Sequence, residues 1–272
     1  MNKLTVSCVI FYPSYDILFS VLFSLAESVS AVSGWEVDVY LINNGDDVFE
    51  REACETLIRK LKSVCSLNIA LISGHGNIGY GAANNLVISK SDSKYHLILN
   101  PDVIVDRDCL RIGIEYLDAL GDIVMLSPNS FSPNTNKMQY LCKRYPSIVV
   151  LLARFLDFGI FNRYIKKHAN LYEYRTETNA GVAFEPEIVS GCFMLCRSSA
   201  LKSIAGFDER FFLYFEDFDL SLRISHYGRL VFLPSMKIYH YGGGAGKKGI
   251  IHIKMFVKSA WKFYRKYRVK WY

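Results

Sequence analysis

Segments with the pattern of buried strands and segments with helical spacing alternate four times within the first 127 residues of this 272-residue chain. Such alternation is typical of βαβ units, which place parallel strands side by side and helices against the sheet. We therefore predict an α/β fold with a mostly parallel central sheet and helices on both faces. The predicted strands are Leu4–Phe11, Glu36–Asn43, Leu67–Ser73, Tyr95–Asn100 and Ile123–Ser127, and the predicted helices are Asp16–Val32, Val48–Val64, Gly81–Ser89 and Asp106–Leu120.

Short polar motifs follow four of these strands, at Tyr12–Ser14, Asn43–Asp47, Ser73–Gly79 and Asn100–Asp102. In parallel sheets of this kind, ligands bind beyond the carboxyl ends of the strands. The simplest explanation for the four motifs is therefore one ligand that contacts several strand ends.

The second half of the chain has a less regular pattern. We predict strands at Val189–Arg197 and Leu230–His240 and a helix at Phe215–Tyr227, with a loop and helical insert at 128–185. The chain is 51% hydrophobic and 21% charged, which indicates a well-buried core and excludes a largely disordered protein.

The cysteines, the N-terminus and the apolar runs indicate the cellular compartment of the protein. Seven cysteines is an odd number and no pair has the Cys-x-x-Cys spacing, so we expect reduced thiols in a cytosolic protein. Pro13, Asp16 and Glu27 interrupt the apolar N-terminus, which we interpret as a strand and a helix and not as a signal peptide. Apolar runs such as Ile148–Ala153 are too short to span a membrane.

Two motifs at strand ends have the chemistry of a phosphate or metal site. Asp102 of Asn100-Pro101-Asp102 could hold a divalent cation through oxygen, although the motif alone favours an ordinary turn. His240, before a glycine run, could ligate a metal or bind phosphate, although a lone histidine is more often structural. The loop Asn77–Asn85 is rich in small residues that permit close approach of a ligand, but its glycine spacing does not match the dinucleotide fingerprint.

Three carboxylates crowd the predicted start of the helix at Phe215: Glu216, Asp217 and Asp219. Acidic residues commonly stabilise helix N-termini, and Asp219 has the spacing of a structural pair with Arg223. Alternatively, one carboxylate is a general base, kept ionised by the helix dipole in a site partly dried by aromatic neighbours.

The order and spacing of these motifs resemble the inverting family 2 glycosyltransferases of the GT-A fold, and especially their bacterial rhamnosyltransferase-like branch. The resemblance extends over roughly residues 4–245 and is specific for fold and reaction class, but weaker for the sugar. The blocks that carry it are Val9–Ser14, Ile42–Asp47, Asn77–Asn85, Leu99–Val103, Ser190–Arg197, Gly206–Asp208, Phe215–Arg223 and His240.

The resemblance implies the site residues. Asp217 matches the catalytic base, and Glu216 would orient the acceptor or the base. Asp102 would bind Mg²⁺ or Mn²⁺ at the donor diphosphate, helped by His240. Nucleotide-sugar contacts are implied for Phe11, Tyr12, Pro13, Asn43, Gly79, Asn84, Asn100, Ser190 and Gly191.

The chain departs from the family pattern at two loops, where Asn43 replaces the usual Asp and Phe11-Tyr12-Pro13 replaces Thr-Tyr-Asn. Asn-Pro-Asp in place of Asp-x-Asp implies dTDP-L-rhamnose as donor, with a UDP-hexose (glucose, galactose or galactofuranose) as the alternative. The implied acceptor is a growing bacterial surface polysaccharide of the O-antigen or capsule type, carried on a lipid diphosphate. A sugar-phosphate nucleotidyltransferase would need a glycine-rich basic loop after the first strand, which is missing. A non-catalytic membrane scaffold would not need the Glu216-Asp217 pair.

The last 26 residues differ from the rest of the chain. Residues 247–272 hold nine of the 32 Lys and Arg and no Asp or Glu, which leaves a mildly acidic body at 1–246 and no basis for nucleic-acid binding.

We predict two units, a glycosyltransferase domain at 1–246 and a basic amphipathic helix at 247–272 that binds the anionic inner face of the cell membrane. The alternative is a terminal helix that docks on the core with its lysines in water. The predicted apolar face is Ile253, Phe256, Val257, Ala260, Trp261, Phe263, Tyr264 and Tyr267, and the predicted basic face is Lys254, Lys258, Lys262, Arg265 and Lys266.

Overall fold

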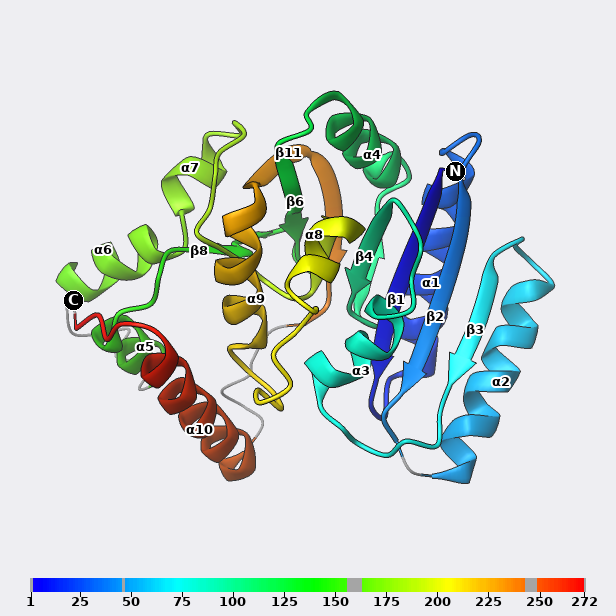
Figure 1. The fold of residues 1–272 in the computed structure, drawn as a ribbon, viewed down its shortest axis with the longest axis horizontal. Coiled ribbons are helices and arrows are strands. Elements are labelled where there is room, and N and C mark those ends of the chain that lie inside the picture. Colours follow the sequence, from blue (N-terminus) through cyan, green and yellow to red (C-terminus); the bar gives the residue numbers. More distant parts are fainter. Residues whose placement is uncertain (1, 46, 156–162, 243–248, 272) are drawn as a thin grey trace.

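The computed structural model describes residues 2–45, 47–155, 163–242 and 249–271. Its first half confirms the predicted alternation of strands and helices, apart from a short extra strand, β5 (Figure 1). The elements of this half are β1 (Lys3–Ile10), α1 (Tyr15–Ser30), β2 (Glu36–Asn43), α2 (Val48–Lys62), β3 (Asn68–Ile72), α3 (Tyr80–Ile88), β4 (Tyr95–Leu99), β5 (Val103–Val105), α4 (Cys109–Ala119) and β6 (Ile123–Phe131).

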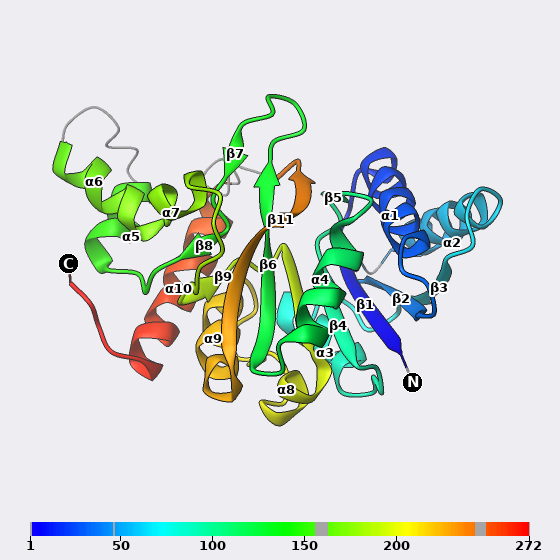
Figure 2. The same ribbon diagram turned by 90° about the horizontal axis from the view of Figure 1, so that it is seen from above.

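The second half corrects the predictions in two places. The strand predicted at Val189–Arg197 is broken into β9 and β10 by Ser190–Cys192, and the insert at 128–185 contains short strands as well as helices. β6 and β7 form a hairpin that projects from the molecule (Figure 2). The elements are β7 (Met138–Gln139), β8 (Cys142–Lys143), α5 (Ile148–Phe155), α6 (Arg163–Tyr172), α7 (Arg175–Asn179), β9 (Ile188–Val189), β10 (Phe193–Arg197), α8 (Ser198–Ser203), α9 (Glu216–Ile224), a 3₁₀ turn (Ser225–Tyr227), β11 (Arg229–His240) and α10 (Ile250–Lys266).

The central sheet is parallel in its first part and mixed in its second. Its strand order is β3-β2-β1-β4-β10-β6-β11-β5, and β7 pairs with β6 outside this path. β3, β2, β1 and β4 are mutually parallel, as predicted. β10 is antiparallel to both of its neighbours, and β5 is antiparallel to β11. The carboxyl ends of the parallel strands therefore meet at one edge, where β11 also ends beside the start of β5.

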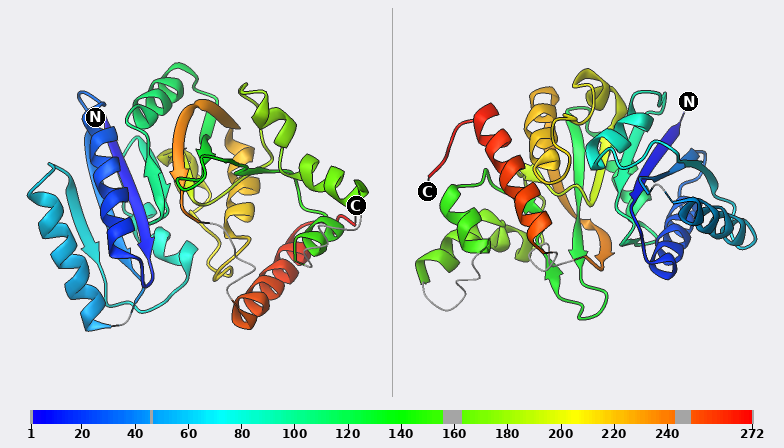
Figure 3. Two further views of the ribbon diagram at one scale, coloured as in Figure 1. Left: turned by 180° about the vertical axis from the view of Figure 1, so that it is seen from behind. Right: turned by 90° about the horizontal axis from the view of Figure 1, so that it is seen from below.

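Helices cover both faces of the sheet, as the sequence predicts. Alternate residues of β1 point to opposite faces. Leu4, Val6 and Cys8 are fully buried against the side covered by α1, α2 and α4 (Figure 3, left). Val9 packs on the other side against α3, and further along that side α8 and α9 cover β4 and β10 (Figure 1). All seven cysteines lie within the described residues and are free thiols.

The C-terminal helix α10 packs against the body beside α5 (Figures 1 and 3). Phe263 is fully buried in an aromatic cluster with Phe211 and Phe215. By contrast, Val257 and Trp261 are each 59% exposed. The predicted single apolar face is therefore divided, because one part of it docks on the core and another part contacts solvent. No helix in the described ranges combines the length and the apolar character needed to cross a membrane.

Candidate active site

Two exposed aromatic side chains mark the end of β1. Phe11 and Tyr12 are 54% and 55% exposed, and their rings contact edge to face at 4.7 Å between centroids. Tyr12 has a left-handed backbone with φ of 47°, which is uncommon for a residue other than glycine and turns the chain into α1. The predicted residues Phe11, Tyr12 and Pro13 thus lie at the edge of the sheet where the parallel strands end. Their contact with a nucleotide stays a prediction.

A buried amide cluster lies at the end of β2. Asn43 Oδ1 accepts a hydrogen bond from the Gly45 N–H at 2.9 Å, whereas the buried Asn43 Nδ2 has no partner among the described residues. Asn44 donates to the Gly79 carbonyl at 3.2 Å and lies 3.0 Å from His75 Nε2. The loops after β2 and β3 are therefore fixed to each other, and Asn43 keeps a donor for a ligand.

Gly79 occupies a position that permits no side chain. Its φ is +90°, and a Cβ would lie 2.6 Å from the carbonyl oxygen of Phe212, which accepts a hydrogen bond from the Tyr80 N–H. Asn84, by contrast, is fully buried and bonds inside the protein to Ser7 Oγ at 2.6 Å and to the Tyr80 carbonyl at 3.0 Å. These contacts fix α3 to β1, and the predicted contact of Asn84 with a nucleotide stays a prediction.

The Asn100-Pro101-Asp102 motif lies where β4, β5 and β11 meet. His240 pairs with Val103 across the sheet, and His240 Nε2 lies 3.5 Å from Asp102 Oδ1. The buried Asn100 Oδ1 and Asp102 Oδ1 atoms have no hydrogen-bond partner among the described residues. A Cβ on Gly242 would lie 2.4 Å from His240 Nε2 and 2.7 Å from Asp102 Oδ2, so glycine keeps the two side chains uncovered. The structure thus brings together the two predicted metal ligands.

The two carboxylates at the start of α9 lie in different surroundings. Asp217 Oδ2 accepts a hydrogen bond from the Gly191 N–H at 3.0 Å, and Oδ1 accepts one from the Phe218 N–H at 3.0 Å. Glu216 is 7% exposed, and its Oε2 has no partner among the described residues. Tyr80, which the sequence analysis did not single out, donates its hydroxyl hydrogen to the Gly191 carbonyl at 2.7 Å. The break in the predicted strand at Ser190–Cys192 therefore positions the backbone beside Asp217.

The backbone immediately before these carboxylates is strained. Tyr214 and Phe215 both have left-handed conformations, with φ of 68° and 66°. Helix α10 braces this loop, because Ser259 Oγ donates to the Leu213 carbonyl at 2.8 Å and His252 Nδ1 lies 2.9 Å from the Tyr214 hydroxyl. The C-terminal helix is thus part of the support of the candidate catalytic loop.

A buried ion-pair network fixes α9 to α10. Asp219 is fully buried and pairs with Arg223 at 2.6 Å, as the sequence spacing predicts, and also with Lys266 at 2.5 Å. The Tyr267 hydroxyl donates to the same carboxylate at 2.9 Å. The helix that begins at Glu216 is therefore fixed to the C-terminal end of α10.

Burial changes the acidity of the candidate catalytic groups. It raises the pKa of Glu216 well above its ordinary value, and the charge of Asp217 adds to the rise. Burial also raises the pKa of Asp217, although the N–H groups of Gly191 and Phe218 oppose the rise. The helix N-terminus that we expected to favour the ionised form is thus outweighed by the loss of water. Such a raised pKa suits a general base, because the pKa lies closer to neutral pH.

We expect Glu216→Gln to stabilise the protein at alkaline pH. Because the pKa of Glu216 is raised by folding, the folded chain holds this proton more tightly than the unfolded chain does. Stability therefore falls as pH rises from the unfolded value, about 4.3, through the raised value. Gln cannot ionise, so the variant should exceed the wild type in stability by a larger margin at pH 8 than at pH 5. Urea unfolding at pH 5 and pH 8 measures this difference, and equal differences at the two pH values would contradict it.

The fold and these groups define the class of protein. The parts of a GT-A type glycosyltransferase are present: a parallel half of the sheet, a carboxylate and an imidazole at the strand ends, and a half-buried carboxylate at a helix N-terminus. The sequence model of glycosyl transferase family 2 matches residues 8–205. The chain belongs to glycosyl transferase family 2, which excludes the nucleotidyltransferase alternative.

Relatives with known functions agree with this family. The chain is 29% identical over 219 residues to the rhamnosyltransferase WbbL of Escherichia coli K12, covering 73% of this chain and 75% of WbbL. It is 25% identical over 215 residues to the N-acetylglucosaminyl-diphospho-decaprenol L-rhamnosyltransferase of Mycobacterium tuberculosis, covering 72% of this chain and 66% of the relative.

Solved structures confirm the fold. The mannosyltransferase PcManGT of Pyrobaculum calidifontis, solved with GDP-Man and Mn²⁺, aligns with a TM-score of 0.58 at 13% identity. The alignment covers 96% of this chain and 60% of PcManGT. GalNAc-T7, solved with UDP, GalNAc and Mn²⁺, aligns with a TM-score of 0.61 at 12% identity and covers 88% of this chain and 43% of that protein. The chain thus spans less than two thirds of the length of these structural neighbours.

Proposed function

We propose that this glycosyltransferase moves L-rhamnose from dTDP-L-rhamnose to a hydroxyl of a growing, lipid-linked polysaccharide, with inversion at the anomeric carbon. The observation that carries the reaction is the half-buried Asp217 beside the Gly191 N–H at the start of α9. The names of two relatives, which are both rhamnosyltransferases, support the donor sugar. The lipid-diphosphate acceptor in the name of the mycobacterial relative supports the acceptor class.

The chemistry follows from the acid–base properties of these groups. A sugar hydroxyl is a poor nucleophile, so Asp217 takes its proton as the oxygen attacks the anomeric carbon. The bond from that carbon to the diphosphate oxygen breaks on the opposite face, and the diphosphate leaves with the electron pair. Glu216, whose raised pKa favours the protonated form, has a carboxyl hydrogen that can be donated to the acceptor. One displacement of this kind inverts the anomeric centre.

A divalent cation, Mg²⁺ or Mn²⁺, fits the residues at the end of β4. Asp102 Oδ1 is buried without a hydrogen-bond partner, beside the imidazole of His240, and carboxylate oxygen and imidazole nitrogen are both ligands for Mn²⁺. The described residues contain no cluster of three or more His, Cys, Asp or Glu side chains that could hold a metal, so donor phosphate oxygens would complete the shell. When bound, the cation offsets the charge on the departing diphosphate.

The nucleotide would lie along the loops after β1, β2 and β3. The buried Asn43 Nδ2 can donate to a carbonyl oxygen of thymine or uracil. Phe11, Tyr12 and Pro13 offer aromatic surface for the base. Ser190 and Gly191, beside Asp217, would lie under the donor sugar. Because thymine and uracil present the same carbonyl groups to Asn43, the donor must be identified by experiment.

The test is a donor panel. The protein is incubated with a GlcNAc-diphospho-lipid analogue and dTDP- or UDP-sugars, with and without Mg²⁺ or Mn²⁺, and the products are weighed by mass spectrometry. We expect addition of a deoxyhexose from dTDP-L-rhamnose and a loss of product on chelation. A hexose added from a UDP-sugar would contradict the proposed donor but keep the mechanism, and product formed equally in EDTA would contradict the metal.

We further propose that the enzyme works at the inner face of the cell membrane, where residues 247–272 bind an anionic surface and 1–246 carry the reaction. The excess of basic residues in this segment supports the attachment. The alternative of a helix docked only on the core accounts for Phe263 but not for the exposed Val257 and Trp261.

A further inference from the structure

The face of α10 that points away from the body combines apolar and basic side chains. Ile250 is 73% exposed, and Val257 and Trp261 are each 59% exposed. At 100° per residue these three side chains fall within one narrow stripe, on the side opposite Ser259 and Phe263, which are buried. The docking of α10 on the core therefore uses one face of the helix and leaves this stripe uncovered.

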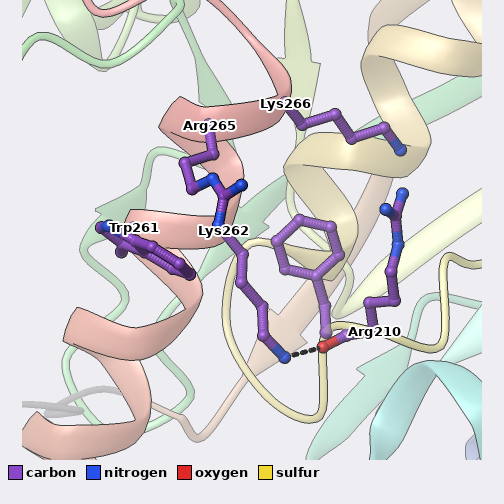
Figure 4. Close-up of a pocket in the computed structure, with 6 residues that line it drawn as sticks. Arg210, Trp261, Lys262, Arg265 and Lys266 are labelled. Atoms are coloured by element: carbon purple, nitrogen blue, oxygen red, sulfur yellow. Dashed lines mark hydrogen bonds between the residues drawn. The ribbon is translucent and has the colours of Figure 1, made fainter.

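A basic pocket opens beside the stripe, between α10 and the loop before α9 (Figure 4). The buried Phe211 is one of its lining residues, and Lys262 donates to the Arg210 carbonyl. The guanidinium of Arg265 lies 4.6 Å from the centre of the Trp261 ring. The residues that line the pocket are Arg210, Phe211, Trp261, Lys262, Arg265 and Lys266.

The charges in this pocket are only partly neutralised. Asp208 pairs with Arg210 at 2.6 Å and with Lys266 at 2.8 Å. Lys262 and Arg265 have no carboxylate partner within 4.0 Å in the described part of the chain. Lys262 contacts a carbonyl and Arg265 contacts a ring, so both keep hydrogen atoms to donate to an anion. The pocket thus contains two cationic side chains with hydrogen atoms left to donate, and it borders an apolar stripe.

We infer that the stripe and the pocket form one lipid-docking surface, in which Ile250, Val257 and Trp261 enter a bilayer and Lys262 and Arg265 hold the phosphate of an anionic phospholipid headgroup. A half-exposed Trp beside basic side chains on one helix is the composition of a helix that lies in a membrane interface. The inference rests on the proposed membrane attachment and narrows it to these residues. It excludes Phe263 and Tyr267, which belong to the broad apolar face predicted from the sequence but pack in the aromatic cluster of the core.

The orientation of α10 places the lipid-docking surface near the candidate active site. The helix starts at the end of the molecule where β1 and β2 end and where α3 and α9 begin (Figure 1). A bilayer along the stripe would therefore lie beside the strand-end edge and the candidate catalytic loop. A lipid-linked acceptor held in that bilayer would enter the site from the same side.

The test is sedimentation of the full-length protein with vesicles of phosphatidylcholine alone or with one quarter phosphatidylglycerol. We expect at least tenfold tighter binding to the anionic vesicles. K262Q/R265Q should weaken that binding by about 30-fold, because each basic residue near an anionic surface contributes about five- to sixfold. K62Q/K202Q removes the same charge from exposed lysines of α2 and α8 and should bind within a factor of three of the wild type. Circular dichroism confirms that each variant is folded.

Further measurements distinguish binding of a bilayer from binding of a small anion or of a second copy of the chain. Val257→Glu should abolish vesicle binding, because it places a charge in the stripe at an exposed position. Undiminished binding by this variant or by K262Q/R265Q would overturn the inference, as would release of the wild type by 10 mM glycerol phosphate, which would indicate a small-anion site. A dimer that Val257→Glu dissociates, with vesicle binding unchanged, would assign the stripe to a second copy of the chain. Because none of these arms requires sugar transfer, a failed donor panel leaves the inference intact, and a failed vesicle assay leaves the reaction intact.

Discussion

Replacing Asp217 by Asn is expected to lower the turnover number for glycosyl transfer by about 1000-fold, within the range of about 10²–10⁴ for loss of a general base. Asn is of the same size and can keep the contact with the Gly191 N–H through its oxygen. It cannot accept the proton of the acceptor hydroxyl at neutral pH. The donor should bind with unchanged affinity, because Asp217 acts on the acceptor.

Product formation measured by mass spectrometry and donor binding measured by calorimetry separate these effects. Glu209→Gln is the matched control, because Glu209 is an exposed carboxylate of the preceding loop whose side chain accepts from Asn85 at 3.0 Å. This control should keep its turnover. Turnover by the Asp217 variant close to that of the control would remove Asp217 from the role of base.

The pH dependence of the wild-type turnover number should also indicate that Asp217 is the base. The base must be deprotonated, and burial raises the pKa of Asp217. The rate should therefore fall on the acid side at a higher pH than the ordinary range of an aspartate, about 3.5–4.

Replacing Asp102 by Ala should remove the dependence of donor binding on a divalent cation. The carboxylate that lies 3.5 Å from His240 Nε2 is lost, and imidazole alone binds Mg²⁺ or Mn²⁺ poorly. We expect the affinity for a nucleoside diphosphate in the presence of Mn²⁺ to fall by about 2–3 kcal/mol, or about 30- to 150-fold, as for loss of a contact with a charged group. In EDTA the variant and the wild type should bind equally.

Calorimetry with dTDP and UDP, with and without Mn²⁺, measures this loss. Asp92→Ala removes a carboxylate that is 85% exposed, at the opposite end of β4, and serves as the charge-matched control. A donor affinity in the Asp102 variant that still rises with Mn²⁺ as in the control would exclude Asp102 as a ligand.

The parts of the fold that were predictable are those encoded by local patterns. The strands and helices from β1 to β6 follow directly from runs of apolar residues and from their spacing, and polar residues after Ile10, Asn43 and Leu99 indicated the edge where a ligand binds. The structure brings Asp102 next to His240, which the resemblance implies as two ligands of one metal, and it places Asp217 next to Gly191. The two residues of each pair are far apart in the sequence, so no local pattern could connect them.

Other features were not predictable for physical reasons. β5 has three residues and depends on pairing with β11. The left-handed conformations of Tyr214 and Phe215 follow from the surrounding contacts, because neither side chain prefers that region. Helical periodicity places Phe263 and Trp261 on different sides of α10, but only the tertiary contacts decide which of the two sides is buried. The burial of Asn84, whose side chain bonds to Ser7, likewise depends on how α3 packs on β1.

The position of β10 has a consequence for the order in which the chain can fold during synthesis. β10 lies between β4 and β6, so the two halves of the sheet are not hydrogen-bonded to each other without it. β4 ends at Leu99 and β10 begins at Phe193, and one edge of the wholly buried β4 has no partner until that later segment leaves the ribosome. An apolar strand with an open edge is a template for intermolecular pairing. The nascent chain therefore passes through a long interval in which this edge can pair with other chains, and truncations before residue 197 should accumulate as insoluble protein.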